Sequence, residues 1–218
     1  MLAIDFDALQ ATPLGREPFD HLVVPGFIRA AALDDVIADF PKVDRPGSFP
    51  MSELSFGAAF AALIEDLGSE RRRLALQEKF DLDLAARPLM CTVRGRCRLA
   101  DGRIHADSAS KILTVLIYLQ PDWDAEGGRL RLLRSAHDIE DYVAEISPRA
   151  GNMLAFRCTD TAWHGHKPFE GERRSIQLNW VTSRAVAWRE QWRHRISART
   201  KTLFSAARGG SRAAGMRP

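Results

Sequence analysis

The sequence predicts an α+β protein in which helices come first and an antiparallel β-sandwich or barrel follows. Two patterns lead to this prediction. In the first half, apolar residues recur at every third or fourth position, which is the period of one helix face. Over residues 88–181, short runs of β-branched and aliphatic residues alternate with Gly- and Pro-containing turns, and no long helical pattern interrupts them. The 218 residues are enough for one well-buried domain and short for two full ones.

The first half opens with a short strand and continues with helices. We expect the strand over residues 21–24, where a Pro-Gly pair closes it, and the first helix over residues 29–40, which end before a proline. Residues 44–50 are rich in Pro and Gly and predict a loop. Two further helices are expected between residues 55 and 80, and Gly68 separates them.

The strands of the second half follow one another with short turns between them. The Asp101-Gly102 pair is a favoured two-residue hairpin turn, so we expect residues 103–105 to pair with the strand before it. Residues 127–133 alternate apolar and basic side chains, as a half-exposed strand does. The expected strands are 89–99, 103–105, 111–120, 127–133, 152–157 and 174–181.

The C-terminal segment, residues 182–218, is strongly basic. It holds nine Lys or Arg residues and one acidic residue, a net charge of +8. Because the whole chain carries +3, residues 1–181 carry −5. We therefore predict one domain over residues 1–181, followed by a basic helix and a flexible tail over 182–218. The tail is either a solvated extension or the place where a polyanionic partner would bind.

Helical spacing in this basic segment places four apolar residues on one stripe. These are Ala185, Trp188, Trp192 and Ile196, and we expect the stripe to pack on the sheet domain. From Arg208 onward the composition predicts disorder.

Composition excludes several classes of protein. No apolar run approaches the ~20 residues that a membrane helix needs. The N-terminus lacks the basic and apolar regions of a secretory signal, so a cytoplasmic protein without a membrane span is expected.

Cys91, Cys97 and Cys158 are scattered and odd in number, which predicts free thiols and no zinc site. Basic and aromatic residues do not interleave, so nucleic-acid binding is not indicated. The sequence carries no signal of an oligomeric state.

His105 and Asp107 are the first residues that suggest chemistry. Imidazole and carboxylate groups bind divalent metals, and a triad of two His and one carboxylate leaves coordination positions open. On a strand the two side chains would share a face, because strand residues two apart point the same way. His164 and His166 are the candidates for a third ligand. A His-x-Asp sequence also arises by chance as a polar surface pair, and these residues alone leave that alternative open.

Further motifs follow His105 and Asp107 in a recognisable order. They are "HAD" (105–107), "TVLIYLQPDWD" (114–124), "GGRLRLL" (127–133), "PRAGNMLAF" (148–156), "WHGHKPF" (163–169) and "ERRS" (172–175). In this order the chain resembles the iron(II)- and 2-oxoglutarate-dependent oxygenases of the prolyl 4-hydroxylase type. The resemblance covers residues 17–181. It implies a double-stranded β-helix, the jelly-roll barrel, with the N-terminal helices packed on it.

The resemblance also implies which residues bind the metal. His105, Asp107 and His164 would be the iron ligands. His164 is preferred to His166 because the family's distal histidine stands four residues before a proline, which here is Pro168.

A buried arginine is expected to bind the distal carboxylate of 2-oxoglutarate, since a guanidinium pairs with a carboxylate through two parallel hydrogen bonds. The family spacing fits both Arg173 and Arg174. An Arg-x-Ser pattern with Ser175 favours Arg173, whereas the spacing to the following tryptophan favours Arg174. The resemblance implies that Tyr118 donates its hydroxyl to the same carboxylate. Thr114, on the same face of that strand, is a further candidate for binding 2-oxoglutarate.

The implied activity is that of a dioxygenase, most often a hydroxylase. Its cofactor would be Fe(2+), its cosubstrates 2-oxoglutarate and O2, and ascorbate an accompanying reductant. The prime substrate, a protein prolyl residue or a small molecule, stays unidentified. Two alternatives are a catalytically silent jelly roll that binds a ligand or partner, and a non-oxygenase metal enzyme of the cupin type. Four arginines cluster near the Asp101-Gly102 turn, and they could line a groove that binds an anionic ligand or form a solvated face. They are Arg94, Arg96, Arg98 and Arg103.

Overall fold

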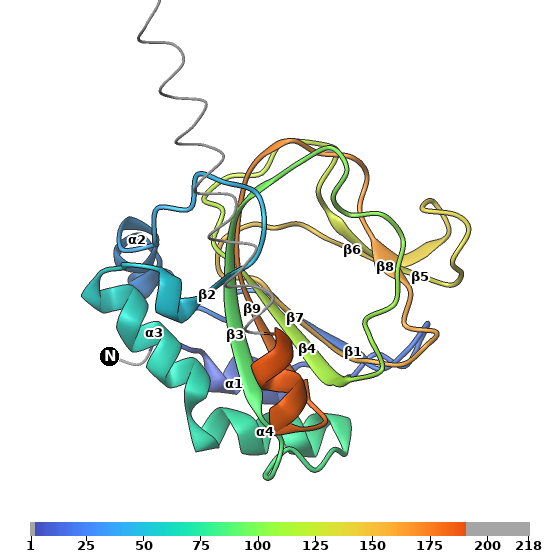
Figure 1. The fold of residues 1–218 in the computed structure, drawn as a ribbon, viewed down its shortest axis with the longest axis horizontal. Helices are drawn as coiled ribbons and strands as arrows, with labels where there is room; N and C mark the ends of the chain where they lie inside the picture. Colours follow the sequence, from blue (N-terminus) through green and yellow to red (C-terminus); the bar gives the residue numbers. More distant parts are fainter. Residues whose placement is uncertain (1–2, 191–218) are drawn as a thin grey trace, which may run out of the picture.

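The computed structural model describes residues 3–190, which form two antiparallel sheets and a layer of helices (Figure 1). The larger sheet has six strands in the order β1-β7-β4-β9-β3-β2, and the smaller has three in the order β6-β5-β8. The strands are β1 (His21–Val24), β2 (Phe49–Pro50), β3 (Leu89–Cys97), β4 (Lys111–Tyr118), β5 (Leu130–Leu133), β6 (Tyr142–Ile146), β7 (Met153–Arg157), β8 (His164–Gly165) and β9 (Gly171–Val181). The helices are α1 (Phe6–Ala11), α2 (Ala30–Ala38), α3 (Ala58–Gly68) and α4 (Glu70–Phe80), and residues 51–53 form a 3-10 turn.

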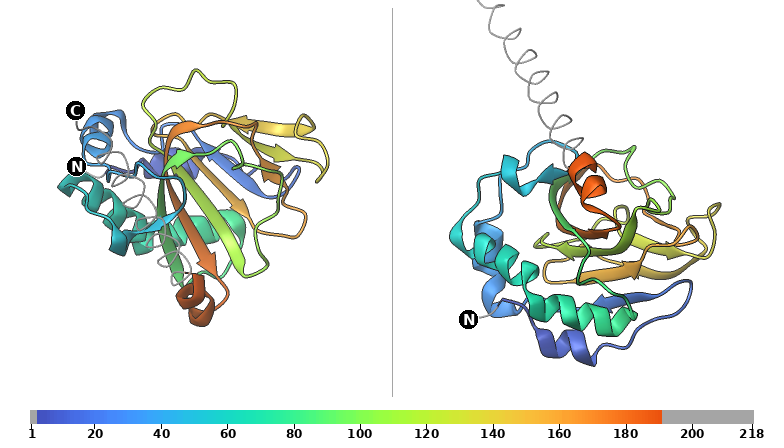
Figure 2. Two further views of the ribbon diagram at one scale, coloured as in Figure 1. Left: turned by 45° about the horizontal axis from the view of Figure 1, so that its top comes forward. Right: turned by 60° about the horizontal axis from the view of Figure 1, so that its bottom comes forward.

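The helices cover one face of the larger sheet, and the smaller sheet faces its other side (Figure 2). A large apolar core fills the space between helices and sheet, with Phe60, Leu63 and Trp180 among its buried residues. A second apolar cluster lies between the two sheets and includes Leu130 and Phe156. The α+β jelly-roll arrangement predicted from the sequence is therefore confirmed.

α2, α3 and α4 lie where the sequence predicts helices, and side-chain caps explain the starts of α1 and α4. Asp5 accepts a hydrogen bond from the backbone N–H of Ala8 at the start of α1. The hydroxyl of Ser69 likewise accepts from the N–H of Arg72 and starts α4 directly after Gly68. The predicted division of the helical region at Gly68 is confirmed. The sequence analysis missed α1, which is short and carries only two buried residues.

Most strands also lie where they were expected, and three were missed. The predicted loop over residues 44–50 ends in β2, which pairs with β3. β8 has only two residues and gives no periodic signal. β6 has the sequence YVAEI, whose β-branched and aromatic residues are a strand signal that the analysis did not use.

The predicted hairpin at Asp101-Gly102 is wrong. The chain does turn there, but residues 103–105 do not return to β3, whose partners are β9 and β2. The hairpin signal depends only on neighbouring residues. β9 has eleven residues, so β3 can form more backbone hydrogen bonds with it than with residues 103–105. His105 instead forms a bridge with His164 of β8. The turn thus carries the chain across to the smaller sheet.

The expectation of a half-exposed strand over residues 127–133 is also wrong, because every residue of β5 is buried. Arg131 is only 6% exposed. Its Nε donates to Glu145 at 2.6 Å, its Nη1 lies 2.9 Å from Glu140, and its guanidinium stacks on the ring of Tyr142. Paired in this way, a basic side chain can be covered by the protein.

Residues 184–190 are helical, but the apolar stripe predicted there is wrong in its described part. Ala185 is exposed and Trp188 is 69% exposed, whereas Ala187 packs beside Met90 and Val181. The helix therefore presents a different face to the sheet. Trp192, Ile196 and the predicted tail from residue 208 lie outside the described residues. Among residues 3–190, no helix has the length and apolar character needed to cross a membrane.

Candidate metal centre

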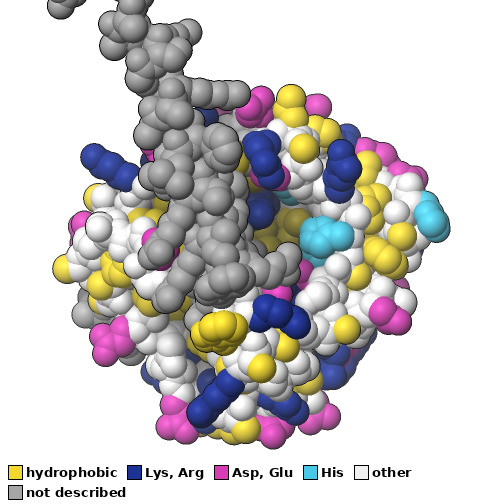
Figure 3. Space-filling model, in the orientation of Figure 1, with side chains coloured by type: hydrophobic (Ala, Val, Ile, Leu, Met, Phe, Trp, Pro, Cys, Tyr) yellow, Lys and Arg dark blue, Asp and Glu magenta, His cyan; other side chains and the backbone are white. Residues whose placement is uncertain are grey.

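A cavity of about 490 Å³ lies between the two sheets, and β4, β9 and β3 form its floor. The strand register arranges the floor in rows. Thr114 of β4 lies opposite Asn179 of β9, and Tyr118 lies opposite Ser175. Figure 3 shows the hollow on the molecular surface, with histidine and basic side chains around it.

The three predicted metal ligands lie at one end of this cavity. One ligand atom each from His105, Asp107 and His164 can be chosen so that all lie within 4.8 Å of one another. Two backbone hydrogen bonds join His105 and His164, at 3.0 Å and 2.9 Å, and the ring centroids are 4.3 Å apart. The expected strand over residues 103–105 is reduced to this single bridge. The bridge nevertheless brings residues that are 59 positions apart in the sequence to one point.

Backbone carbonyls fix the orientation of both imidazoles. The Nδ1 of His105 lies 2.8 Å from the carbonyl oxygen of Arg103, and that of His164 lies 2.9 Å from the carbonyl oxygen of Ala162. Because a carbonyl only accepts, Nδ1 carries the hydrogen in each ring. The lone pair of each Nε2 is then available to a metal ion. Burial, followed by the nearby His105, lowers the pKa of His164 to about 4, so this ligand is neutral at pH 7.

The Asp107 carboxylate is held at both oxygens. Lys111 donates to Oδ1 at 2.7 Å, and the Thr114 hydroxyl donates to Oδ2 at 2.6 Å. Burial alone would raise the pKa of Asp107, but the charges of Lys111 and His164 and these two hydrogen bonds outweigh it and hold the pKa below its usual value. Asp107 is therefore an oriented, ionised ligand. Lys111 was missed in the sequence, because a spacing of four residues indicates an ion pair only on a helix and residues 107–111 are not helical.

Thr114 lies at the metal end of the cavity. Besides Asp107, its hydroxyl contacts the Oδ1 of Asn179 at 2.9 Å. The sequence analysis proposed Thr114 as a residue that binds 2-oxoglutarate. In the structure its hydroxyl contacts the proposed metal ligand Asp107.

Arg173 and Tyr118 meet at the opposite end of the cavity. Arg173 is 4% exposed, its Nε donates to the carbonyl oxygen of Gly128 at 2.8 Å, and its Nη2 lies 3.5 Å from the Tyr118 hydroxyl. Ser175, two residues further along β9, has a buried Oγ without a hydrogen-bond partner among the described residues. These three side chains offer hydrogen-bond donors from one corner of the cavity, which is what a buried carboxylate requires.

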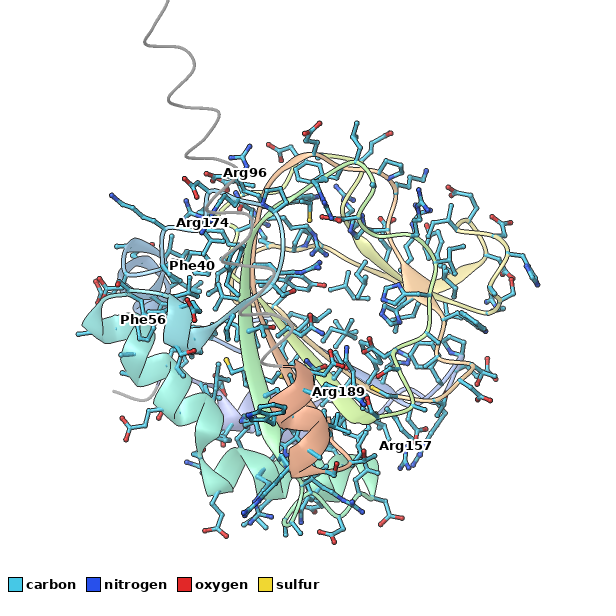
Figure 4. The ribbon with its side chains drawn as sticks, viewed as in Figure 1. Phe40, Phe56, Arg96, Arg157, Arg174 and Arg189 are labelled. Carbon is cyan, nitrogen blue, oxygen red and sulfur yellow. The ribbon has the colours of Figure 1, made fainter. Side chains whose placement is uncertain are left out.

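Arg174 points to the other side of the sheet. Its guanidinium lies over the ring of Phe40 and pairs with Glu172, on the helical side (Figure 4). The structure therefore brings only Arg173 of the two candidate arginines into the cavity.

His166, the less favoured candidate for the third metal ligand, is buried and lines the cavity. Its Nδ1 donates to the carbonyl oxygen of Lys167 at 2.8 Å. Burial and then the charge of Arg173 lower its pKa to about 4. All three cysteines are free thiols, as predicted.

The residues fit the groups that the sequence suggested. Two imidazoles and a carboxylate form a donor set suited to Fe(II). The orphaned hydroxyl of Ser175 and the buried guanidinium of Arg173 suit the distal carboxylate of 2-oxoglutarate.

Comparison with known proteins finds similarity to the same family of oxygenases. Residues 98–182 match the family profile described as 2OG-Fe(II) oxygenase superfamily. A Pseudomonas putida prolyl-4-hydroxylase aligns with a TM-score of 0.54 at 19% identity, over 84% of this chain and 100% of the other. No curated protein matches the chain by sequence.

Two further structures are similar. The viral collagen prolyl hydroxylase of Paramecium Bursaria Chlorella virus-1 aligns with a TM-score of 0.51 at 14% identity, over 75% of this chain and 90% of the other. HygX from Streptomyces hygroscopicus, with nickel and 2-oxoglutarate bound, aligns with a TM-score of 0.50 at 14% identity, over 75% and 82%. The predicted resemblance to prolyl-hydroxylase-type oxygenases is confirmed.

Proposed function

We propose that this chain, which resembles the 2OG-Fe(II) oxygenases, is an iron(II)- and 2-oxoglutarate-dependent hydroxylase. The observation that carries the proposal is a cavity with a complementary group at each end. His105, Asp107 and His164 converge at one end. Arg173 and Tyr118 meet at the other. A silent jelly roll would have no need of the first group, and a cupin-type enzyme would have no need of the second.

Iron would be held by the Nε2 atoms of His105 and His164 and by the carboxylate of Asp107. When bound, it supplies the oxidation chemistry that uses O2 and 2-oxoglutarate. Three protein ligands leave coordination positions for those two molecules. The chain's own contribution is to keep the ligands oriented through the carbonyls of Arg103 and Ala162 and through Lys111 and Thr114.

The cosubstrate would be anchored by Arg173, with Tyr118 and Ser175 donating hydrogen bonds to the same carboxylate. Burial strengthens these interactions, because water does not compete for the donors. Apolar side chains of Leu116, Leu130 and Phe156 line part of the cavity and would limit the access of water to the bound groups.

The fold indicates only a broad class of substrate. We propose hydroxylation of a C–H bond in a protein prolyl residue or a small molecule. Residues 1–181 would form the oxygenase domain, and the basic residues 182–218 would lie outside it.

The direct test is release of labelled CO2 from 2-oxoglutarate by the purified chain with iron(II) and ascorbate, before any substrate is known. Turnover should disappear in the His105→Ala and His164→Ala variants, because each removes a metal ligand. His137→Ala is the matched control, since His137 is an exposed histidine outside the cavity, and it should keep full turnover. Absence of CO2 release from the wild-type chain, or its persistence in the ligand variants, would contradict the proposal.

A further inference from the structure

The cavity contains more positive charge than the metal and cosubstrate sites use. Arg94, Arg103, Lys111 and Arg173 all line it. Lys111 is paired with Asp107, and Arg173 belongs to the proposed cosubstrate anchor. Arg94 and Arg103 form no ion pair among the described residues. Two cationic side chains are therefore available to a ligand.

Arg94 is the better placed of the two because a strand fixes its backbone. It lies on β3 opposite Ser175 of β9, in the same row as Tyr118. Its side chain is half-buried, and its Nε donates to the Ser48 hydroxyl at 2.8 Å. Since Nε is occupied, the two terminal Nη groups are the donors left for a ligand, and together they match the two oxygens of an anionic group.

Asp101, an acidic neighbour of Arg94, is already engaged. Asp101 is close enough for Arg94 to act on it electrostatically, as is His166. However, the Asp101 carboxylate accepts from the backbone N–H and from Nη2 of Arg98, both at 3.0 Å. It therefore leaves the guanidinium of Arg94 without a bidentate partner.

The other arginines of the basic cluster do not reach this position. Arg98 is exposed and bonded to Asp101. Arg96 lines a separate groove on the helical side of the sheet, beside Arg174 and Glu172 (Figure 4). The sequence did not show which of the four arginines faces the cavity. The strand register and the turn after β3 show it.

We propose that Arg94 binds an anionic group of the prime substrate, either a carboxylate or a phosphate. The proposal rests on the proposed hydroxylase function and specifies its substrate class. Arg94 lies opposite Ser175 and two strands from Tyr118, about 10 Å at the usual strand spacing. The anion of the substrate would therefore lie on the β3 side of Ser175, and the cosubstrate carboxylate on the side of Arg173 and Tyr118. Arg94 is also four residues along β3 from the row of Thr114 and Asn179, so several bonds separate the anionic group from the carbon that reacts at the metal.

The test is a calorimetric titration of the full chain loaded with manganese(II), which binds in place of iron without turnover, and saturated with 2-oxoglutarate. The probes are acetate for a carboxylate and methyl phosphate for a phosphate. At least one probe should bind to the wild-type chain. Arg94→Gln should weaken its binding roughly 10- to 100-fold, as loss of a charge-assisted hydrogen bond does. Arg96→Gln, on the same strand but facing the helices, should bind the probe as the wild type does.

Three results would overturn the proposal. Neither probe binds to the wild-type chain, or Arg94→Gln binds both unchanged, or Arg94→Gln weakens 2-oxoglutarate binding as much as Arg173→Gln does. The last result would make Arg94 part of the cosubstrate anchor. Because the titration needs no turnover, a chain that fails to decarboxylate 2-oxoglutarate would contradict the proposed function while leaving this test intact.

Discussion

Arg173 and Arg174 are neighbours on β9, yet they face opposite sides of the larger sheet. This alternation follows from strand geometry, in which successive side chains point to opposite faces. The sequence spacing admitted both residues, because a shift of one position leaves the motif intact. Only the register of β9 against β4, which places Ser175 beside Tyr118, determines which arginine enters the cavity.

Replacement of each arginine by glutamine separates the two roles. Arg173→Gln should raise the 2-oxoglutarate concentration needed for half-saturation roughly 10- to 100-fold, since it removes a buried, charge-assisted contact. Arg174→Gln should change it less than about twofold, because exposed ion pairs contribute little. Saturation curves of CO2 release measure both. Equal effects of the two substitutions would show that Arg173 is not the anchor.

Thr114 illustrates what strand periodicity can predict. Its even spacing from Tyr118 places both residues on one face of β4, but periodicity does not show which group each side chain contacts. The hydrogen bond to Asp107 assigns it to the ligand environment.

Thr114→Val keeps the shape of the side chain and removes its hydroxyl. Metal affinity should fall about 10- to 100-fold, as it does when a group that orients a metal ligand is lost. Equilibrium dialysis against iron(II) or manganese(II) gives the affinity. Thr92→Val is the matched control, because Thr92 is also a buried threonine on the cavity floor but makes no contact with Asp107, and it should bind metal normally. Unchanged affinity in Thr114→Val would mean that the hydroxyl does not orient the ligand.

At the level of the elements, α4 carries an unusual feature on its buried face. Arg72 is 1% exposed, and its three guanidinium nitrogens have no hydrogen-bond partner among the described residues. The group stacks on the ring of Trp180 at 4.7 Å. Burial lowers its pKa to about 10, although the nearby Cys91 opposes the shift. An unpaired buried charge of this kind opposes folding.

Arg72→Met should therefore leave the free energy of unfolding unchanged or raise it by about 1–3 kcal/mol, because it removes unsatisfied donors and keeps a long side chain. Denaturant unfolding followed by fluorescence measures the change. Arg73→Met, one position along and hydrogen-bonded to Gln77 and Glu70, should lower stability by less than about 1 kcal/mol. A loss larger than 2 kcal/mol in Arg72→Met would indicate that the arginine stabilises the packing of α4 on the sheet.

The elements also show what local sequence can predict. Two features were predicted correctly because neighbouring residues determine them. One is the helix boundary at Gly68 and Ser69, and the other is the β-branched strand β4. The hairpin at Asp101-Gly102 failed because strand pairing is a long-range choice, made here by β9. The burial of β5 was missed for the same reason, since Arg131 is covered by glutamates from a later part of the chain.

For the whole molecule, the jelly roll is what brings distant residues together. His105 and His164 meet because the chain crosses from the larger sheet to the smaller one after β3 and again before β9. The sequence resemblance predicted this meeting and the order of the motifs. It could not predict the side-chain network around the site, in which Lys111, Asn179 and Gly128 hold the principal residues, because those contacts depend on register and packing.

The most direct test of the account is joint binding of iron(II) and 2-oxoglutarate, measured without oxygen by equilibrium dialysis. The wild-type chain should bind one iron and, only when iron is present, one tightly held 2-oxoglutarate. Asp107→Ala should lose the iron and with it the tight cosubstrate, and Arg173→Gln should keep the iron but bind 2-oxoglutarate weakly. Iron bound normally by Asp107→Ala, or 2-oxoglutarate bound equally well with and without metal, would contradict the single site described here.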